Sequence, residues 1–334
     1  MHKKIYLSVI LGILFFVSCK DKKQYYESGT VFHTLYTIKY EAPHILTDKI
    51  DAELQKFNLS LNPFNPNSII AKVNNNEAVE VDEWFTEVFN KSMEVSRNSD
   101  GVFDITCAPL VNLWGFGFNK KDSVTPAMID SLKTFVGYRK VHLEGKKVVK
   151  DDPRLLLNCS AIAKGYSCDV IARLLEKEGV ENYMILIGGE VVVKGVNQNG
   201  VCWRTGINLP EDDPDGIKNN YDEIVQLCKK GAIATSGNYR NFYIKDGKKY
   251  AHTIDPRTGY PAEQSVLSAT IVANDCMTAD AYATAFMAMG LEKARQMADS
   301  LPEIEYYVIY ADENGKHQIE YSKGMLQYLP KRKQ

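Results

Sequence analysis

Hydrophobic residues recur along the chain with two different periods, and each period predicts its own kind of element. A period near 3.6 residues predicts helices over residues 45–57, 82–97 and 277–289, with Asp82 as an N-cap and Gly290 as the end of the third. Thr125-Pro126 opens a further helix, and Ser160 is expected to cap one that runs to about residue 178. Runs of β-branched and aromatic residues predict strands at 31–40, 184–187, 191–193, 203–208, 224–227, 232–235, 242–244, 266–273 and 305–310.

Helices and strands follow one another irregularly, and one hairpin is expected over residues 140–150. This order predicts an α+β fold of mixed, mostly antiparallel sheets with packed helices, not a doubly wound parallel sheet. The chain carries no internal repeat and no long linker, so residues 29–330 are expected to form a single compact catalytic unit. Residues 211–221, rich in Asp and Asn, predict an exposed loop or insertion.

The N-terminus predicts export and a lipid anchor. Two lysines precede an apolar run over residues 5–17, which is too short to span a bilayer comfortably. Ser18-Cys19 follows directly, as at a bacterial lipoprotein processing site. We therefore expect residues 1–18 to be a signal peptide and residues 19–28 to be a tether. Cys19 is expected to carry the lipid that attaches the chain to a bacterial membrane without spanning it. The alternative is a plain secretory signal that is cut nearby.

Composition excludes some partners. A formal net charge of −2, with no basic stripe, gives no electrostatic reason to bind nucleic acid. Six cysteines follow Cys19, without a C-x-x-C pair and inside largely apolar segments. In a domain of this size we expect buried free thiols, although an exported chain is able to pair some of them; a zinc site or a disulfide framework is not expected.

Several segments carry side chains suited to phosphate and metal chemistry. Lys164 lies one turn inside a predicted helix start, where free N–H groups and the helix dipole favour phosphate oxygens. Asp280 and Thr284 are four residues apart and share a helix face, and such oxygen ligands suit Mg²⁺. Ser236 belongs to an expected tight turn at residues 234–238, and His252 begins a loop stiffened by two prolines. Each segment alone is equally or more readily explained as ordinary structure.

The order of these segments resembles the FAD:protein FMN transferase family, often called ApbE-type. The quoted motifs are FDITCAPLVNLWGFG, AIAKGY, IGGE, ATSGNY, HTIDPRTGYP and TADAYATA, and they span roughly residues 29–290. Three positions differ from the family pattern. Phe32-His33-Thr34 stands where the family usually reads Met-Gly-Thr, Asn158 stands in place of Asp, and Phe64 stands in place of Tyr.

The resemblance implies FAD as the substrate and Mg²⁺ at its pyrophosphate. By position, it implies a metal held by Asp280, Thr284 and the carbonyls of Ala161 and Ala283. It implies His252 near the reacting phosphate as the catalytic residue. The residues that it implies for FAD binding are Phe32, Phe64, Val102, Phe103, Asp104, Asn158, Lys164, Ser236 and Ile254.

The resemblance implies an Mg²⁺-dependent transferase. It is expected to pass the FMN half of FAD to a Thr or Ser hydroxyl of an acceptor flavoprotein, a membrane redox subunit, and to release AMP. The exported, lipid-anchored chain itself is expected to face the periplasm. Two alternatives stay open. An Mg²⁺-dependent FAD pyrophosphatase uses water in place of the acceptor hydroxyl and the same residues. A lipid-anchored flavin-binding or solute-binding protein performs no chemistry.

Overall fold

An eight-stranded antiparallel sheet runs through the molecule in the order β1-β2-β5-β6-β9-β14-β15-β16. The structure is a computed structural model that describes residues 22–117, 123–212, 220–239, 242–245, 248–262 and 265–330. The strands are β1 (Lys23–Val31), β2 (Thr34–Ala42), β3 (Val141–Glu144), β4 (Lys147–Lys150), β5 (Tyr183–Ile187), β6 (Glu190–Lys194), β7 (Trp203–Asn208), β8 (Tyr221–Leu227), β9 (Gly231–Gly237), β10 (Phe242–Lys245), β11 (Lys248–Ala251), β12 (Ile254–Asp255), β13 (Tyr260–Pro261), β14 (Val266–Ala273), β15 (Ile304–Ala311) and β16 (His317–Tyr321).

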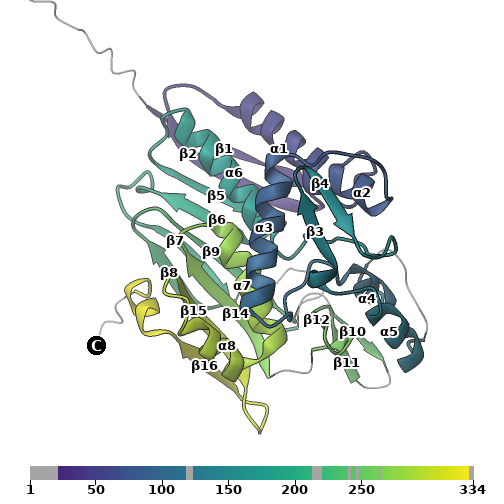
Figure 1. Cartoon of the computed structure of the whole chain (residues 1–334). Helices are drawn as coiled ribbons and strands as arrows, with labels where there is room; N and C mark the ends of the chain where they lie inside the picture. The colour runs from purple at the N-terminus through teal and green to yellow at the C-terminus, as the bar shows by residue number, and fades with distance from the viewer. Residues whose placement is uncertain are drawn as a thin grey trace, which may run out of the picture.

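Helices cover one face of this sheet, and Figure 1 shows α1, α3 and α6 in front of it. Helix α6 packs on β5 and β6, and α7 packs on β9 and β14. The helices are α1 (Thr47–Leu61), α2 (Ile69–Asn74), α3 (Glu83–Asn98), α4 (Ala108–Leu113), α5 (Pro126–Lys133), α6 (Ala163–Lys177), α7 (Cys276–Met289) and α8 (Leu291–Ala298), with short 3-10 helices at Tyr138–Lys140 and Lys323–Gln327.

The opposite face is covered by the β7–β8 hairpin and the C-terminal 3-10 helix. Strand β6 shows how the two faces are divided, because Val192 packs with the helix-side core whereas Val191 and Val193 pack with Trp203 of β7. This alternation follows from the two-residue period of a strand. The sheet is therefore buried on both faces, between the helices and the small hairpin.

Most of the predicted elements are present. Asp82 caps α3 by accepting the Phe85 N–H at 2.8 Å, and Thr125 caps α5. The expected hairpin forms from β3 and β4. Helix α7 ends at Gly290, whose φ of +80° suits a residue without a Cβ.

Four local predictions are wrong. Residues 31–40 are not one strand, because β1 and β2 form a hairpin that turns at Phe32 and His33. Residues 23–28, expected in the tether, are the first part of β1. Ser160 does not cap α6, which begins after Ile162 without a side-chain cap, and residues 234–237 continue β9 instead of forming a tight turn.

The prediction of free thiols holds for four cysteines, of which Cys107 is only half-buried, and fails for two. Cys107, Cys159, Cys168 and Cys276 are free, whereas Cys202 and Cys228 form a disulfide across the β7–β8 hairpin. The predicted signal peptide and Cys19 lie outside the described residues, as do residues 213–219 of the expected loop. Across the described part of the chain, no helix is long and apolar enough to cross a membrane.

Candidate functional site

The N-terminal halves of α6 and α7 approach each other closely, and Gly165 makes this approach possible. A Cβ on Gly165 would lie 2.2 Å from the Cys276 carbonyl oxygen and 2.7 Å from the Asp280 Cβ. The Gly165 N–H donates to Oδ2 of Asp280 at 2.9 Å. Asp169 of α6 reinforces the contact, because its carboxylate accepts the N–H groups of Cys276 and Met277 at the start of α7. Gly165 and Asp169 of α6 thus fix the position of α7, and with it the position of Asp280.

Three charged side chains meet beside this helix contact. The ammonium group of Lys164 donates to Oε1 of Glu190 at 2.6 Å and lies 3.7 Å from Oδ1 of Asp280. Both carboxylates are buried, whereas a third of the Lys164 side chain is exposed. The lysine head therefore reaches this buried acidic pair from a partly open position, from which it is able to meet a phosphate.

Burial and neighbouring charge shift the proton affinities of this cluster. Burial acts to lower the pKa of Lys164, but Asp280 and Glu190 outweigh it and raise that pKa above its ordinary value. Burial raises the pKa of Glu190 to about 7, and the lysine charge opposes this rise. Lys164 is thus a permanent cation at neutral pH, which is the state needed to bind a phosphate oxygen.

Thr284 lies one turn after Asp280 on α7, and its hydroxyl is 3.2 Å from that of Ser236 on β9. The Gly165 N–H lies four residues after Ala161 but donates to Asp280 in place of that carbonyl. Carboxylate, hydroxyl and carbonyl oxygens from Asp280, Thr284 and Ala161 make a hard ligand set that fits Mg²⁺. Ala283 is fully buried inside α7, next to Thr284.

This protein ligand set is small. Within the described ranges, no three His, Cys, Asp or Glu side chains are grouped to hold a metal ion by themselves. Mg²⁺ commonly takes one or two carboxylates from the protein and its other ligands from phosphates and water. A metal held around Asp280 would therefore take its remaining ligands from water or, when one is bound, from a phosphorylated ligand.

Two turns at one end of the strands border Lys164, Glu190 and Asp280, which we call the charged cluster. Phe32 and His33 occupy the β1–β2 turn with φ of +51° and +60°, the left-handed conformation that a two-residue hairpin of this type requires. The Gly188 N–H of the β5–β6 turn donates to the Leu35 carbonyl at 3.0 Å. A Cβ on Gly188 would lie 3.0 Å from Cδ of Lys164 and 3.2 Å from Cγ2 of Thr34. The hairpin turn is thereby placed beside Lys164.

The two aromatic candidates differ in exposure. Phe32 packs on Phe57, with ring centroids 5.0 Å apart, and is half-buried against the core. Phe64 is 51% exposed and meets the His33 ring edge-on at 5.7 Å. Phe64 is therefore the more solvent-exposed of the two rings, whereas Phe32 anchors the turn on Phe57.

A backbone hydrogen bond joins Asn158 to the loop that contains Val102, Phe103 and Asp104. The Asn158 N–H donates to the Ile105 carbonyl at 2.7 Å, two residues from Phe103. Val102 and Phe103 are buried in the core. The Asp104 carboxylate accepts the N–H groups of Thr106 and Tyr138, and burial raises its pKa. Asp104 thus stabilises the backbone conformation of its own loop by linking it to Thr106 and Tyr138.

The loop that begins at His252 is fixed by contacts on both sides. Ile254 is buried with Trp114, whose indole N–H donates to the Gly259 carbonyl at 2.8 Å. Asp255 and Arg257 form a bidentate ion pair within the same turn. The His252 ring lies 6.4 Å from that of Phe116, and strand β12, two residues after His252, packs against α7. The loop that follows His252 thus packs against α7, the helix that carries Asp280.

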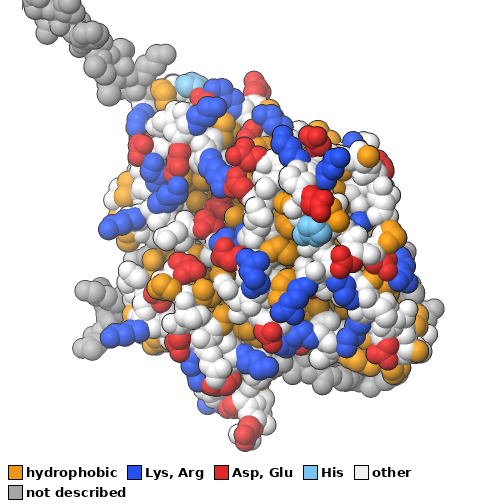
Figure 2. All heavy atoms as spheres, viewed as in Figure 1, with side chains coloured by type: hydrophobic (Ala, Val, Ile, Leu, Met, Phe, Trp, Pro, Cys, Tyr) orange, Lys and Arg blue, Asp and Glu red, His pale blue; other side chains and the backbone are white. Residues whose placement is uncertain are grey.

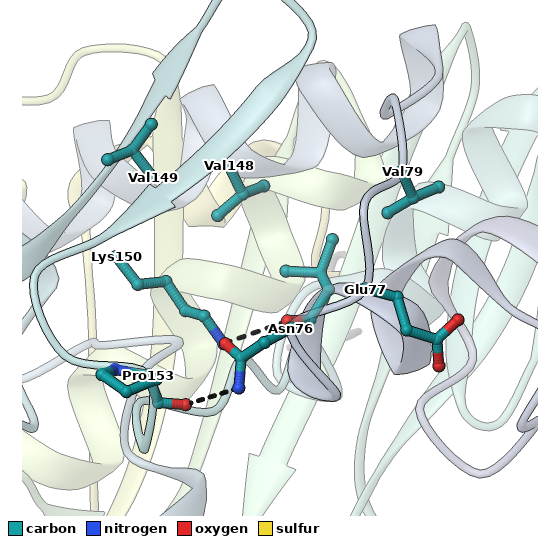
Figure 3. A pocket seen from close by; sticks show the side chains of 8 residues that line it. Asn76, Glu77, Val79, Val148, Val149, Lys150 and Pro153 are labelled. Atoms are coloured by element: carbon teal, nitrogen blue, oxygen red, sulfur yellow. Dashed lines mark hydrogen bonds between the residues drawn. The ribbon is translucent and has the colours of Figure 1, made fainter.

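Two surface cavities lie outside the charged cluster. The first, of about 340 Å³, contains none of the candidate residues (Figure 3). The Lys150 ammonium in it donates to the Val73 and Leu155 carbonyls. The second, of about 330 Å³, touches only Asp104 among the candidates. Its lining is Asp100, Gly101, Asp104, Lys133, Val136, Gly137, Tyr138, Arg139, Lys140, Pro256 and Arg257. Neither cavity supplies the chemistry of the site.

The structure brings some candidates together and adds residues that the sequence did not single out. Hydrogen bonds and ion pairs join Lys164 to Asp280 and Ser236 to Thr284. Glu190 was part of a quoted motif but had no role, and it now proves to be the tightest partner of Lys164. Thr34 borders the same cluster through Gly188. A lone acidic residue after two glycines gave no chemical signal in the sequence.

Comparison with known proteins decides the family. The sequence model of the ApbE family matches residues 32–308. This chain belongs to the ApbE family. It is 36% identical over 307 residues to the FAD:protein FMN transferase of Vibrio cholerae, covering 88% of this chain and 90% of that protein. It is 31% identical over 314 residues to the FAD:protein FMN transferase of Escherichia coli K12, covering 87% and 88%.

Solved ApbE structures agree with the fold. The flavin transferase ApbE from Vibrio cholerae superposes with a TM-score of 0.82 at 34% identity, covering 92% of this chain and all of that one. The apo flavinyl transferase ApbE of Pseudomonas stutzeri gives a TM-score of 0.81 at 26% identity, covering 94% and 99%. These likenesses confirm the ApbE resemblance and the α+β fold class predicted from the motifs.

Proposed function

We propose that this chain is an FAD:protein FMN transferase that requires Mg²⁺ and releases AMP. One observation carries the proposal: in an ApbE-family fold, the Lys164 cation lies 3.7 Å from the buried carboxylate of Asp280, with the hydroxyl of Thr284 one turn further along α7. A pyrophosphate carries several negative charges, which a lysine and a metal would together offset during phosphoryl transfer.

Asp280, Thr284 and the carbonyls of Ala161 and Ala283 would hold the metal. When bound there, Mg²⁺ would offset negative charge on the pyrophosphate oxygens. Ser236 orients the Thr284 hydroxyl, and Lys164 is available to bind a phosphate oxygen directly. The ring of Phe64, which is 51% exposed, would stack on an aromatic part of FAD.

In the proposed step, the hydroxyl oxygen of an acceptor Thr or Ser attacks the phosphorus on the FMN side of FAD. A new P–O bond forms to the acceptor, and the bond between that phosphorus and the bridging oxygen breaks, so that AMP leaves with the bridging oxygen. His252 accepts the hydroxyl proton, because imidazole is the side chain that most readily exchanges protons near neutral pH. Lys164 offsets the charge that develops on the leaving phosphate.

We further propose that the chain acts outside the cytoplasm, lipid-anchored through Cys19 and facing the periplasm, on a membrane redox subunit. The apolar run before Cys19 supports export, and the Cys202–Cys228 disulfide supports an oxidising compartment. Replacing Cys19 by Ala should move the protein from the membrane fraction to the soluble fraction. An unchanged membrane fraction would contradict the lipid anchor.

Formation of AMP together with covalent flavin on the acceptor tests the proposed function. Purified protein would be incubated with FAD and a Thr-bearing acceptor, with Mg²⁺ or with EDTA. AMP and flavinylated acceptor in equal amounts, lost in EDTA, support the transferase. AMP with free FMN alone supports the pyrophosphatase, and intact FAD bound equally well in EDTA supports the non-catalytic binder.

A further inference from the structure

Glu190 has one partner where a buried carboxylate normally has several. Its side chain is only 4% exposed and lies at the start of β6. Oε1 accepts from the Lys164 ammonium, whereas Oε2 has no hydrogen-bond partner among the described residues. A buried charge is costly unless it is paired, so the position of Glu190 requires a role.

The β5–β6 turn sets the distance between Glu190 and Lys164. Gly188 has φ of +68°, and a Cβ there would lie 3.0 Å from Cδ of Lys164 and 3.1 Å from Oε2 of Glu190. A side chain at this position would press on both members of the pair. The absence of a side chain at Gly188 therefore allows Lys164 to contact Glu190 at the start of β6.

Lys164 is shared unequally between two carboxylates. It lies 2.6 Å from Glu190 but 3.7 Å from Oδ1 of Asp280, which is longer than a hydrogen bond. The other Asp280 oxygen accepts the Gly165 N–H. Oδ1 is thus the Asp280 oxygen that this arrangement leaves for a metal. A shift of the ammonium by about 1 Å would close a direct ion pair on that oxygen.

We propose that Glu190 is a positioning residue that holds Lys164 away from Asp280 and so keeps a carboxylate oxygen open for a divalent cation. The inference rests on the metal site of the proposed function. One lysine with two carboxylates gives the pocket a formal charge of −1, which attracts a divalent cation. With the cation bound, the charge becomes +1, which attracts a pyrophosphate.

Binding of Mn²⁺ without FAD, followed by electron paramagnetic resonance at pH 8, tests this role independently of catalysis. In Glu190→Gln, Lys164 should pair with Asp280, and the dissociation constant for Mn²⁺ should rise about 10-fold or more. In Lys164→Met, no lysine competes, and binding should be at least as tight as in the wild type. The double variant should bind within about 3-fold of Lys164→Met, because the competitor is absent.

Glu176→Gln is the matched control. Glu176 lies on α6, near its C-terminal end, and accepts from Lys230 instead of Lys164. It should leave Mn²⁺ binding unchanged. If Glu190→Gln does not fold, Glu190→Asp keeps the charge but shortens the reach, and its dissociation constant should still exceed that of the wild type.

Three results would overturn the inference. Wild-type affinity in Glu190→Gln would mean that Glu190 does not position the lysine. A double variant as weak as Glu190→Gln would make Glu190 a direct metal ligand instead. No Mn²⁺ binding by the wild type would reject the proposed metal site and this inference with it, whereas the first two results leave that site standing.

Discussion

At the scale of single residues, Asp280 connects three parts of the site. Its carboxylate accepts the Gly165 N–H, lies beside Lys164 and precedes Thr284 by one helical turn. We expect Asp280→Asn to lower Mg²⁺-dependent AMP release by about 100-fold or more, because the amide cannot replace a charged metal ligand. Asn keeps an oxygen for the Gly165 N–H, so the melting temperature should change little. AMP release at the wild-type rate would reject the metal assignment.

His252 has a separate role that a second substitution isolates. We expect His252→Ala to lower flavin transfer by about 100-fold or more through loss of the general base. The dissociation constant for FAD should stay within about 3-fold of the wild type, since the nucleotide-binding residues are untouched. Titration of FAD fluorescence gives the binding constant, and AMP release gives the rate. An equal loss of binding and rate would make His252 a binding residue.

Individual residues could be predicted where their spacing carried a signal. Asp280 and Thr284 were expected on one helix face from their four-residue separation, and α7 places them so. Glu190 and Thr34 could not be predicted, because strand pairing and the β5–β6 turn bring them to Lys164 from distant parts of the chain. Their role depends on tertiary geometry that one sequence does not contain.

At the scale of elements, the contact between α6 and α7 depends on the absence of a side chain at position 165. We expect Gly165→Ala to destabilise the protein by about 1–3 kcal/mol, because the new methyl group would press on the Cys276 carbonyl. Urea unfolding gives the free energy. In the control Gly231→Ala, the Cβ meets Leu227 at an ordinary 3.6 Å, and the loss should be smaller. Equal losses would contradict the packing argument.

Elements with strong periodicity or caps followed from the sequence, whereas turns with unusual residues did not. The Asp82 cap and the α3 face were expected and are present. The β1–β2 hairpin was missed because its turn places Phe32 and His33 at positive φ, where Gly, Asn or Asp is usual. Ser160 looked like a cap, but the chain makes a turn at Asn158, whose side chain accepts the Ser160 N–H.

At the scale of the whole molecule, the surface charge is mixed and one disulfide links the described part of the chain. Acidic and basic side chains are interspersed on the face shown in Figure 2, in keeping with a formal net charge of −2. The disulfide joins Cys202 and Cys228, 26 positions apart, across the β7–β8 hairpin that covers one face of the sheet. This hairpin contributes to the core but none of the residues of the charged cluster.

We expect Cys228→Ser to lower the free energy of unfolding by about 2–4 kcal/mol, because the reduced chain has more conformational freedom when unfolded. Urea unfolding with and without a reducing agent measures the difference. The reducing agent should destabilise the wild type and leave the variant unchanged. Equal sensitivity of both proteins would mean that this disulfide is not the one that stabilises the fold.

The central claim is that the acceptor hydroxyl attacks the phosphorus on the FMN side of FAD. The most direct measurement uses FAD carrying a radioactive phosphorus at that position, with Mg²⁺ and a Thr-bearing acceptor, in a single turnover. We predict label on the acceptor and unlabelled AMP in equal amount. Label in free FMN would show hydrolysis, and label released with the adenosine half, or retained in intact FAD, would contradict the account.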